Sequence, residues 1–167
     1  MRRPFLIKHD GISGVETFFP LQFEDERGRV QRMCRIDDPH IGLRGMEEIY
    51  FSTVFPGVVK AWHLHKEMWL RYACVYGSVV VGLYDDREDS PTRGNSMVCH
   101  LNMVGKSYKV LCIPPFVWNG FRCDLEWSDK SIIANCASQP YRPDEIVRMK
   151  IEDAPFEFDW GEYEVSG

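Results

Sequence analysis

The sequence predicts an all-β protein, built from antiparallel strands as a sandwich or barrel. Three observations support this fold class. Short apolar stretches rich in Val, Ile, Tyr, Phe and Trp follow one another, turn residues separate them, and helix signals are weak. Since 167 residues is the length of about one ordinary domain, we expect residues 1–167 to form a single domain.

Six apolar stretches mark the expected strands, and each has the length of an ordinary strand. Turn-forming residues lie between them, namely Pro56-Gly57, Gly77, Gly94-Asn95 and Pro114-Pro115. Strands are therefore expected at residues 58–64, 69–76, 78–84, 97–103, 108–113 and 131–137.

Helix signals are limited to one short segment. Residues 142–149 carry Pro143 near their start, a position that the first turn of a helix tolerates. The prediction is therefore a barrel of antiparallel strands with one or two short helices.

Composition excludes several partners. Twenty Lys and Arg against 25 Asp and Glu give a net charge of −5, so no basic footprint points to nucleic acid or to an anionic membrane. The longest apolar runs are only a few residues, far short of a membrane span. After Arg2 and Arg3 only three apolar residues follow, too few for a signal peptide.

The six cysteines are interpreted as reduced packing residues. None stands in a C-x-x-C pair, and four lie inside apolar runs. Such thiols are typical of a reducing compartment, so a cytoplasmic location is expected.

Two histidines stand at alternate positions of the stretch at residues 58–65. Strand alternation places His63 and His65 on one face, shared with Val59 and Ala61, and Lys60 on the other. We expect the histidine face to look into the barrel. Alternation in the next strand places Tyr72 on the same face as Leu70.

Three further segments carry a resemblance to a known family. They are Phe-Glu-Asp-Glu-Arg-Gly at 23–28, Gly-Val-Val-Lys-Ala-Trp-His at 57–63 with the Ser-Pro-Thr of 90–92, and Ile-Pro-Pro at 113–115 followed by Asn-Gly-Phe. In order and spacing the chain resembles the dTDP-4-dehydrorhamnose 3,5-epimerase family over roughly residues 15–160. The resemblance implies a cupin jelly roll, a homodimer, and a dTDP-4-keto-6-deoxy sugar as substrate.

The resemblance assigns roles to several residues. His63 matches the catalytic base, Asp85 and Arg87 match positions beside the site, and Arg27 matches an arginine that contacts the nucleotide phosphates. Lys60 stands where the family has a phosphate-binding arginine, so the charge is kept but the bidentate fork is lost. Tyr141 resembles the tyrosine near the thymine.

Other family positions are changed. Leu70 stands in place of the catalytic lysine, Asn119 in place of a histidine, and Ala134 in place of the catalytic tyrosine. The aspartate that orients the family's histidine lies beyond Trp160 and has no expected counterpart. The chain is thus identified as a divergent member.

A second, shorter resemblance is to dTDP-4-keto-6-deoxyglucose 3,4-ketoisomerases, which are also small dimeric cupins. It rests on His-Leu-His-Lys at 63–66 and on Val117-Trp118, and covers about a third of the chain. It accounts for His65, and for Trp118, which we expect at a pocket mouth stacked on a base or sugar.

The histidine pair has three interpretations: a metal site, an acid–base site, or two satisfied barrel histidines. A metal-binding cupin needs further ligands where Leu70 and Asn119 stand, so no metal and no other cofactor is expected. We favour acid–base chemistry, because a ketone acidifies the neighbouring C–H bonds and one base with one donor then suffices.

The resulting hypothesis is a nucleotide-sugar epimerase of deoxysugar or cell-surface polysaccharide biosynthesis. His63 removes the proton, Asn119 or Lys60 stabilises the enolate, and Tyr72 or His65 returns a proton. His65 or Asp85 is expected to fix the tautomer of His63. The alternatives are a 3,4-ketoisomerase and a non-catalytic cupin that binds sugar nucleotides.

Overall fold

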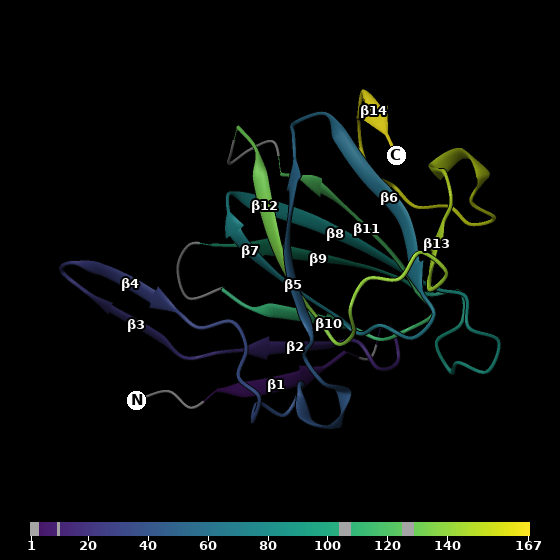
Figure 1. Cartoon of the computed structure of the whole chain (residues 1–167). Coiled ribbons are helices and arrows are strands. Elements are labelled where there is room, and N and C mark those ends of the chain that lie inside the picture. Colours follow the sequence, from purple (N-terminus) through teal and green to yellow (C-terminus); the bar gives the residue numbers. More distant parts are fainter. Residues whose placement is uncertain (1–3, 10, 104–107, 125–128) are drawn as a thin grey trace.

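The computed structural model describes residues 4–9, 11–103, 108–124 and 129–167. They form two facing antiparallel sheets of a jelly roll (Figure 1). The first sheet has the order β1-β2-β10-β7-β12-β5, with β1 (Phe5–Lys8), β2 (Glu16–Phe19), β5 (Glu48–Val54), β7 (Leu70–Tyr76), β10 (Val110–Ile113) and β12 (Ser131–Ala137). The second has the order β13-β6-β11-β8-β9, with β6 (Val58–His65), β8 (Ser78–Asp85), β9 (Ser96–Asn102), β11 (Val117–Cys123) and β13 (Ile146–Arg148).

Smaller elements flank the sheets. Strands β3 (Gln22–Asp25) and β4 (Gly28–Gln31) form a hairpin that extends away from the rest of the chain in Figure 1. Strand β14 (Val165–Ser166) pairs in parallel with β6, and η1 (Gly42–Arg44) and η3 (Ile151–Asp153) are single 3-10 turns. The predicted all-β fold and each of the six predicted strands are confirmed.

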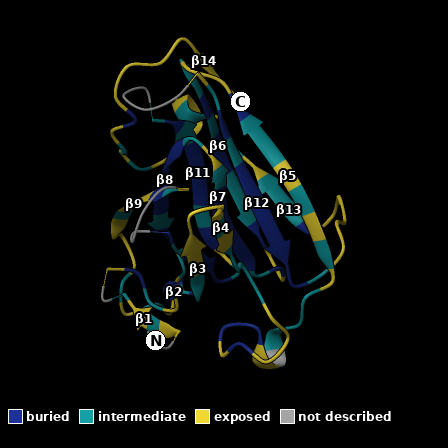
Figure 2. Ribbon diagram, turned by 90° about the vertical axis from the view of Figure 1, so that its left-hand side faces the viewer, coloured by how far each residue is buried: buried dark blue, intermediate teal, exposed yellow. Residues whose placement is uncertain are grey.

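The apolar core is formed by the inward side chains of both sheets. In Figure 2 the buried residues, in dark blue, are concentrated in these strands. Alternation explains it: on β7 Leu70, Tyr72 and Cys74 point inward, while Ala73 joins a second cluster on the outer face. All six cysteines are free and five are buried.

The predicted helix at residues 142–149 is wrong. Residues 143–145 form a turn and Ile146–Arg148 form β13, which pairs with His63–His65 of β6. Two β-branched residues, Ile146 and Val147, favour extended backbone, and the open edge of β6 supplies hydrogen-bond partners that a short isolated helix would lack.

Strand β6 contains a β-bulge that strict alternation did not predict. His63 lies opposite Asn119, and Lys60 lies opposite Phe121. Between these two pairs β6 therefore has one residue more than β11. Lys60 therefore turns inward with His63. Val59 and Ala61, expected beside the histidines, instead pack outside the barrel in a cluster with Trp62 and Trp160.

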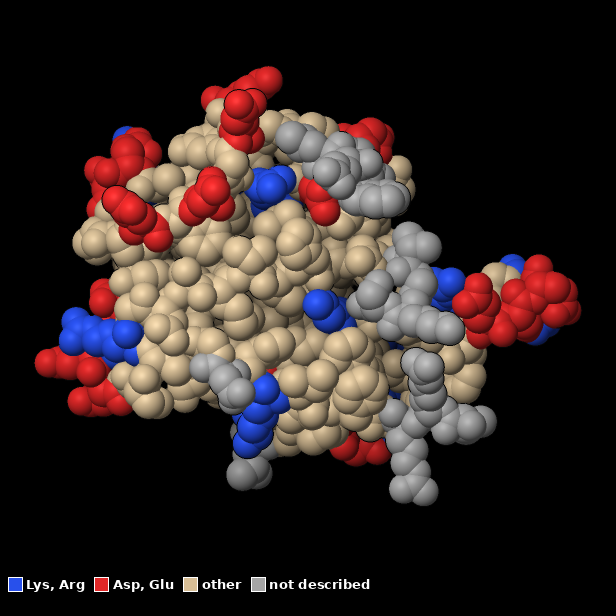
Figure 3. Space-filling model, turned by 180° about the vertical axis from the view of Figure 1, so that it is seen from behind, with Lys and Arg blue, Asp and Glu red and all other residues tan. Residues whose placement is uncertain are grey.

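Within the described residues, no helix has the length and apolar character that crossing a membrane would require. On the face seen in Figure 3, Lys and Arg side chains are scattered rather than gathered into a basic patch. This distribution agrees with the net charge of −5.

Candidate active site

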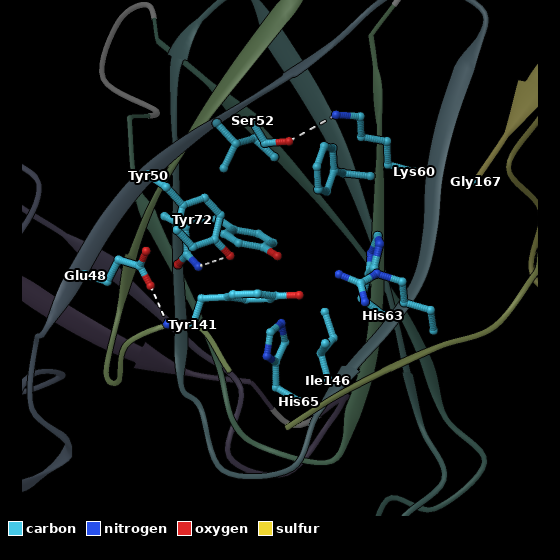
Figure 4. Close-up of a pocket in the computed structure, with 14 residues that line it drawn as sticks. Glu48, Tyr50, Ser52, Lys60, His63, His65, Tyr72, Tyr141, Ile146 and Gly167 are labelled. Carbon is cyan, nitrogen blue, oxygen red and sulfur yellow. Dashed lines mark hydrogen bonds between the residues drawn. The ribbon is translucent and has the colours of Figure 1, made fainter. Parts of the chain in front are cut away.

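A pocket of about 590 Å³ opens between the two sheets, at the side where β5, β12 and β7 face β13, β6 and β11 (Figure 4). The inward residues of these strands line it. Its lining includes Glu48, Tyr50, Ser52, Lys60, His63, His65, Tyr72, Phe121, Ile133, Asn135, Tyr141, Ile146 and Arg148.

His63 enters the pocket from β6 and lies opposite Tyr50 and Tyr72 in Figure 4. Burial lowers the pKa of His63 to about 4, and the charge of Arg148 adds to the effect. The imidazole is therefore neutral at pH 7 and has a lone pair with which to accept a proton.

His65 follows on the same face and is paired with a carboxylate. Its Nδ1 lies 2.8 Å from Oε2 of Glu145, and both side chains are almost fully buried. Oε1 of Glu145 accepts backbone N–H bonds from Glu67 and Met68. Burial raises the pKa of Glu145, but these hydrogen bonds outweigh burial and lower it, so Glu145 is ionised and Nδ1 of His65 carries the hydrogen.

Two cations line the pocket beside His63. The Lys60 ammonium donates to Ser52 Oγ at 3.2 Å, and burial lowers the pKa of Lys60. Arg148 lies directly opposite His63 in the pairing of β13 with β6. Sequence reasoning missed Arg148, because it assigned this segment to a helix. Arg148 reaches the pocket because the Ile-Val-Arg stretch pairs as a strand with the edge of β6.

Tyr72 lines the pocket from β7, and its hydroxyl donates to Asn119 Oδ1 at 3.2 Å. Asn119 is fully buried behind Tyr72, and its Nδ2 donates to the carbonyl of His63. The expectation that Asn119 hydrogen-bonds a substrate enolate is wrong, since these bonds already engage both ends of its amide.

Tyr50 is a second tyrosine of this wall, and sequence reasoning did not single it out. Its oxygen accepts a hydrogen bond of 2.9 Å from Asn135 Nδ2. Burial raises the pKa of Tyr50, so the phenol stays protonated at neutral pH. Alternation along Glu48–Val54 is the signal that could have found it, because Glu48, Tyr50 and Ser52 share the pocket face.

Asp85 and Arg87 lie away from the pocket, which corrects their predicted place beside the base. The buried Asp85 carboxylate accepts hydrogen bonds from Arg87, Ser90 and Thr92 at 2.6–2.8 Å, all on the turn that follows β8 and away from His63. Burial alone would raise the pKa of Asp85, but these bonds lower it. The ion pair of Asp85 and Arg87 stabilises the turn that follows β8.

Three predicted binding residues have different positions. Tyr141 lines the pocket and is half exposed, with its backbone N–H donating to Glu48. Trp118 points outward from β11 and does not line this pocket; it lines a second, separate hollow with Leu64 and Phe116. Arg27 lies in the turn of the β3–β4 hairpin, where it pairs with Asp25 at 2.5 Å, outside this chain's pocket.

The positions of the changed family residues are also clear. Leu70 is packed in the core, and Ala134 lies opposite Ala73 and Phe51, away from the pocket. A register shift between Ile132 and Ile133 turns Ile133 and Asn135 inward instead. Within the described residues, no three His, Cys, Asp or Glu side chains gather as metal ligands.

Comparisons with known proteins agree with this geometry. A family model described as dTDP-4-dehydrorhamnose 3,5-epimerase matches residues 9–167. A probable low-salt glycan biosynthesis epimerase of Haloferax volcanii is 34% identical over 141 residues, which cover 81% of this chain and 86% of the relative. The spore coat polysaccharide biosynthesis protein SpsL of Bacillus subtilis is 32% identical over 151 residues, 89% of this chain and 96% of the relative.

A solved structure gives the same result. The dTDP sugar isomerase of Desulfovibrio desulfuricans superposes with a TM-score of 0.81 at 35% identity, covering 91% of this chain and 95% of that one. With a match over nearly the whole chain, the same two-sheet fold and relatives above 30% identity, the chain belongs to the dTDP-4-dehydrorhamnose 3,5-epimerase family.

Proposed function

We propose that the protein is an isomerase that epimerises a nucleotide-linked 4-keto-6-deoxy sugar during polysaccharide biosynthesis. One observation carries the proposal: a neutral histidine, His63, stands in a pocket with two cations, Lys60 and Arg148, in a chain of this family. The two curated relatives bear names from glycan and spore-coat polysaccharide biosynthesis, which supports the same setting.

Epimerisation requires that one proton is removed from a sugar carbon and that another is added to the same carbon from the opposite side. His63 takes the proton from the carbon next to the ketone, and the C–H electrons move to the carbonyl oxygen to give an enolate. Lys60 or Arg148 stabilises that negative charge. A protonated group on the facing wall then returns a proton to the same carbon from the other side, which inverts its configuration.

Substrate binding follows from charge and shape. A nucleoside diphosphate carries negative charges that two convergent cations neutralise, and Lys60 and Arg148 provide them. Tyr141, half exposed at the pocket, offers a ring for stacking against the base or sugar. His65, held by Glu145, remains a candidate for proton transfer at a second carbon.

The active form we propose is a homodimer in the cytoplasm. Strand β5 is the edge of its sheet and exposes Ile49 and Phe51, with 60% and 67% of their surface accessible. The projecting hairpin exposes Phe23 and Val30 as well. Such a hairpin suits insertion into a second chain, with Arg27 reaching the partner's phosphates. Six free thiols support a reducing compartment.

The test is incubation with dTDP-4-keto-6-deoxyglucose in deuterium oxide, followed by NMR of the sugar. Deuterium at C3 and C5, with inverted configuration at both carbons, indicates double epimerisation. Deuterium at C3 alone, with the product's structure determined, separates 3-epimerisation from 3,4-ketoisomerisation. Nucleotide binding with no deuterium uptake would leave a binding protein and contradict the proposal.

The His63→Asn variant tests the base. It keeps polarity and approximate size, so it should lower exchange by roughly two to four orders of magnitude, the usual contribution of a general base. Affinity for dTDP should stay within a few-fold, because Lys60 and Arg148 are intact. Exchange at the wild-type rate would remove His63 from the mechanism.

A further inference from the structure

We propose that Tyr50 is the proton donor that faces His63, and that Tyr72, the tyrosine the sequence favoured, is not. The inference rests on the proposed epimerase function and assigns one of its two proton transfers. It follows from the direction of the hydrogen bonds that two buried asparagines make to these tyrosines.

Backbone groups fix the orientation of Asn119. Its Nδ2 lies 2.9 Å from the carbonyl oxygen of His63 and 3.4 Å from that of Val117, and a carbonyl accepts only. The amide oxygen of Asn119 must therefore point at Tyr72, where it can only accept. The Tyr72 hydroxyl consequently donates its hydrogen to Asn119, away from any substrate.

Asn135 has the opposite orientation, again because of the backbone. Its Oδ1 accepts the backbone N–H of Arg71 at 2.9 Å, and an N–H donates only. Its Nδ2 therefore points at Tyr50 and donates to the phenolic oxygen. The hydrogen of the Tyr50 hydroxyl is not used in this bond and is free to point into the pocket.

The placement of Tyr50 suits proton return. Tyr50 and Tyr72 enter from the wall that faces His63 (Figure 4). A donor opposite the base delivers its proton to the other side of the sugar carbon, which epimerisation requires. The bond from Asn135 also stabilises the phenolate that remains after transfer.

The proton balance closes without another reactant. His63 gains the proton from carbon, and Tyr50 breaks its O–H bond to form the new C–H bond. Water then removes the proton from the His63 imidazolium and restores the proton of Tyr50. During this second step the enolate oxygen re-forms the C=O bond, and the electron pair of the C=C bond forms the new C–H bond.

The experiment uses the Tyr50→Phe variant of the full chain with dTDP-4-keto-6-deoxyglucose in deuterium oxide. Epimer formation should fall at least a hundredfold, because the donor is lost. Solvent exchange with retained configuration should continue, because His63 still removes the proton and returns a deuteron on the same face. Affinity for dTDP should change by less than a few-fold.

Tyr76→Phe is the matched control, since Tyr76 is exposed on β7 and its hydroxyl contacts Asp129 outside the pocket. It should epimerise at the wild-type rate. Tyr72→Phe should lower the rate less than Tyr50→Phe does.

Three outcomes would contradict the inference. Normal epimer formation by Tyr50→Phe, or a loss in Tyr72→Phe equal to or greater than that in Tyr50→Phe, would overturn the assignment while leaving the epimerase function in place. A wild-type protein without exchange would overturn the function itself, and the role of Tyr50 with it.

Discussion

His63 and His40 take up protons less readily in the folded chain than in the unfolded one. Burial lowers the pKa of each to about 4 from the ordinary 6.5. Above pH 6.5 both states hold neutral imidazoles, so folding is unaffected. As the pH falls from about 6.5 toward 4, these two histidines become protonated in the unfolded chain but stay neutral in the folded chain. The free energy of unfolding therefore decreases.

Urea unfolding at pH 7.5 and pH 5 measures this effect. Wild type should be less stable at pH 5, and His63→Asn should show a smaller difference between the two pH values, because one of the two histidines no longer titrates. Buried carboxylates such as Asp85 contribute equally in both proteins and cancel in the comparison. An identical pH difference would show that His63 is solvated in the folded state.

Lys60 and Arg148 should each contribute to phosphate binding. Removing one partner of a charge-assisted hydrogen bond costs about 1.5–3 kcal/mol, so Lys60→Gln and Arg148→Gln should each weaken dTDP binding by roughly tenfold to a hundredfold. Titration calorimetry at two salt concentrations checks this, because loss of a cation also reduces the salt dependence. Lys150→Gln is the control, since Lys150 is exposed near Glu152 and outside the pocket. A normal affinity in Arg148→Gln would exclude it from the phosphate site.

At this scale the sequence predicted part of the site. Alternation correctly placed His63 and His65 on the inward face of β6, and Tyr72 with Leu70 on the inward face of β7. The motif failed for Asp85, whose motif neighbours Arg87, Ser90 and Thr92 turn out to be its hydrogen-bond partners. A motif shows which residues occur together, but it does not show whether they form a structural hydrogen-bond network or a catalytic site.

Strand β6 shows what alternation cannot supply. The bulge between Lys60 and His63 places both side chains in the pocket, whereas regular alternation would separate them. Bulges depend on the partner strand, here on Gly120 of β11. A Cβ at Gly120 would lie 2.4 Å from the Ala61 Cβ and 3.0 Å from the Lys60 carbonyl oxygen, so only glycine allows this approach.

Gly120→Ala should therefore destabilise the chain and displace the catalytic strand. Forcing a methyl group against backbone costs about 1–3 kcal/mol, and β6 should shift with Lys60 and His63 on it. Urea unfolding at fixed protein concentration and the exchange rate both check this. Gly11→Ala is the control, because a Cβ there meets only the Met97 side chain at 3.5 Å and beyond. A stable, fully active Gly120→Ala would show that the bulge tolerates the added atom.

The strand prediction succeeded where apolar stretches were long and failed where pairing decided the structure. All six predicted strands exist, because buried central strands read as continuous apolar runs. Strand β13 was predicted as a helix, since three residues have no periodicity of their own and β6 selects their conformation. Strand β5 was missed, although its alternation carries Tyr50.

On the scale of the whole molecule, the strand pattern predicted an antiparallel sandwich or barrel, and the family resemblance implied the jelly roll and a homodimer. The many short strands separated by Gly and Pro turns predict the all-β class, and the structure confirms two facing sheets. The hairpin that carries Arg27 contributes no residue to its own chain's pocket, and the proposed dimer would place it against a second chain. Sedimentation at micromolar concentration should give twice 19.5 kDa, and a monomer would contradict the proposed dimer.

Mixing two inactive variants tests whether Arg27 serves the partner's pocket. Arg27→Ala and His63→Asn should each be nearly inactive alone. In a mixed dimer, one pocket combines His63 of one chain with Arg27 of the other and is complete, while the second pocket lacks both. Random exchange of subunits makes half of the dimers mixed, so activity should recover to about one quarter of wild type. No recovery, with mixed dimers verified by tagged purification, would place Arg27 in its own chain's site or outside the reaction.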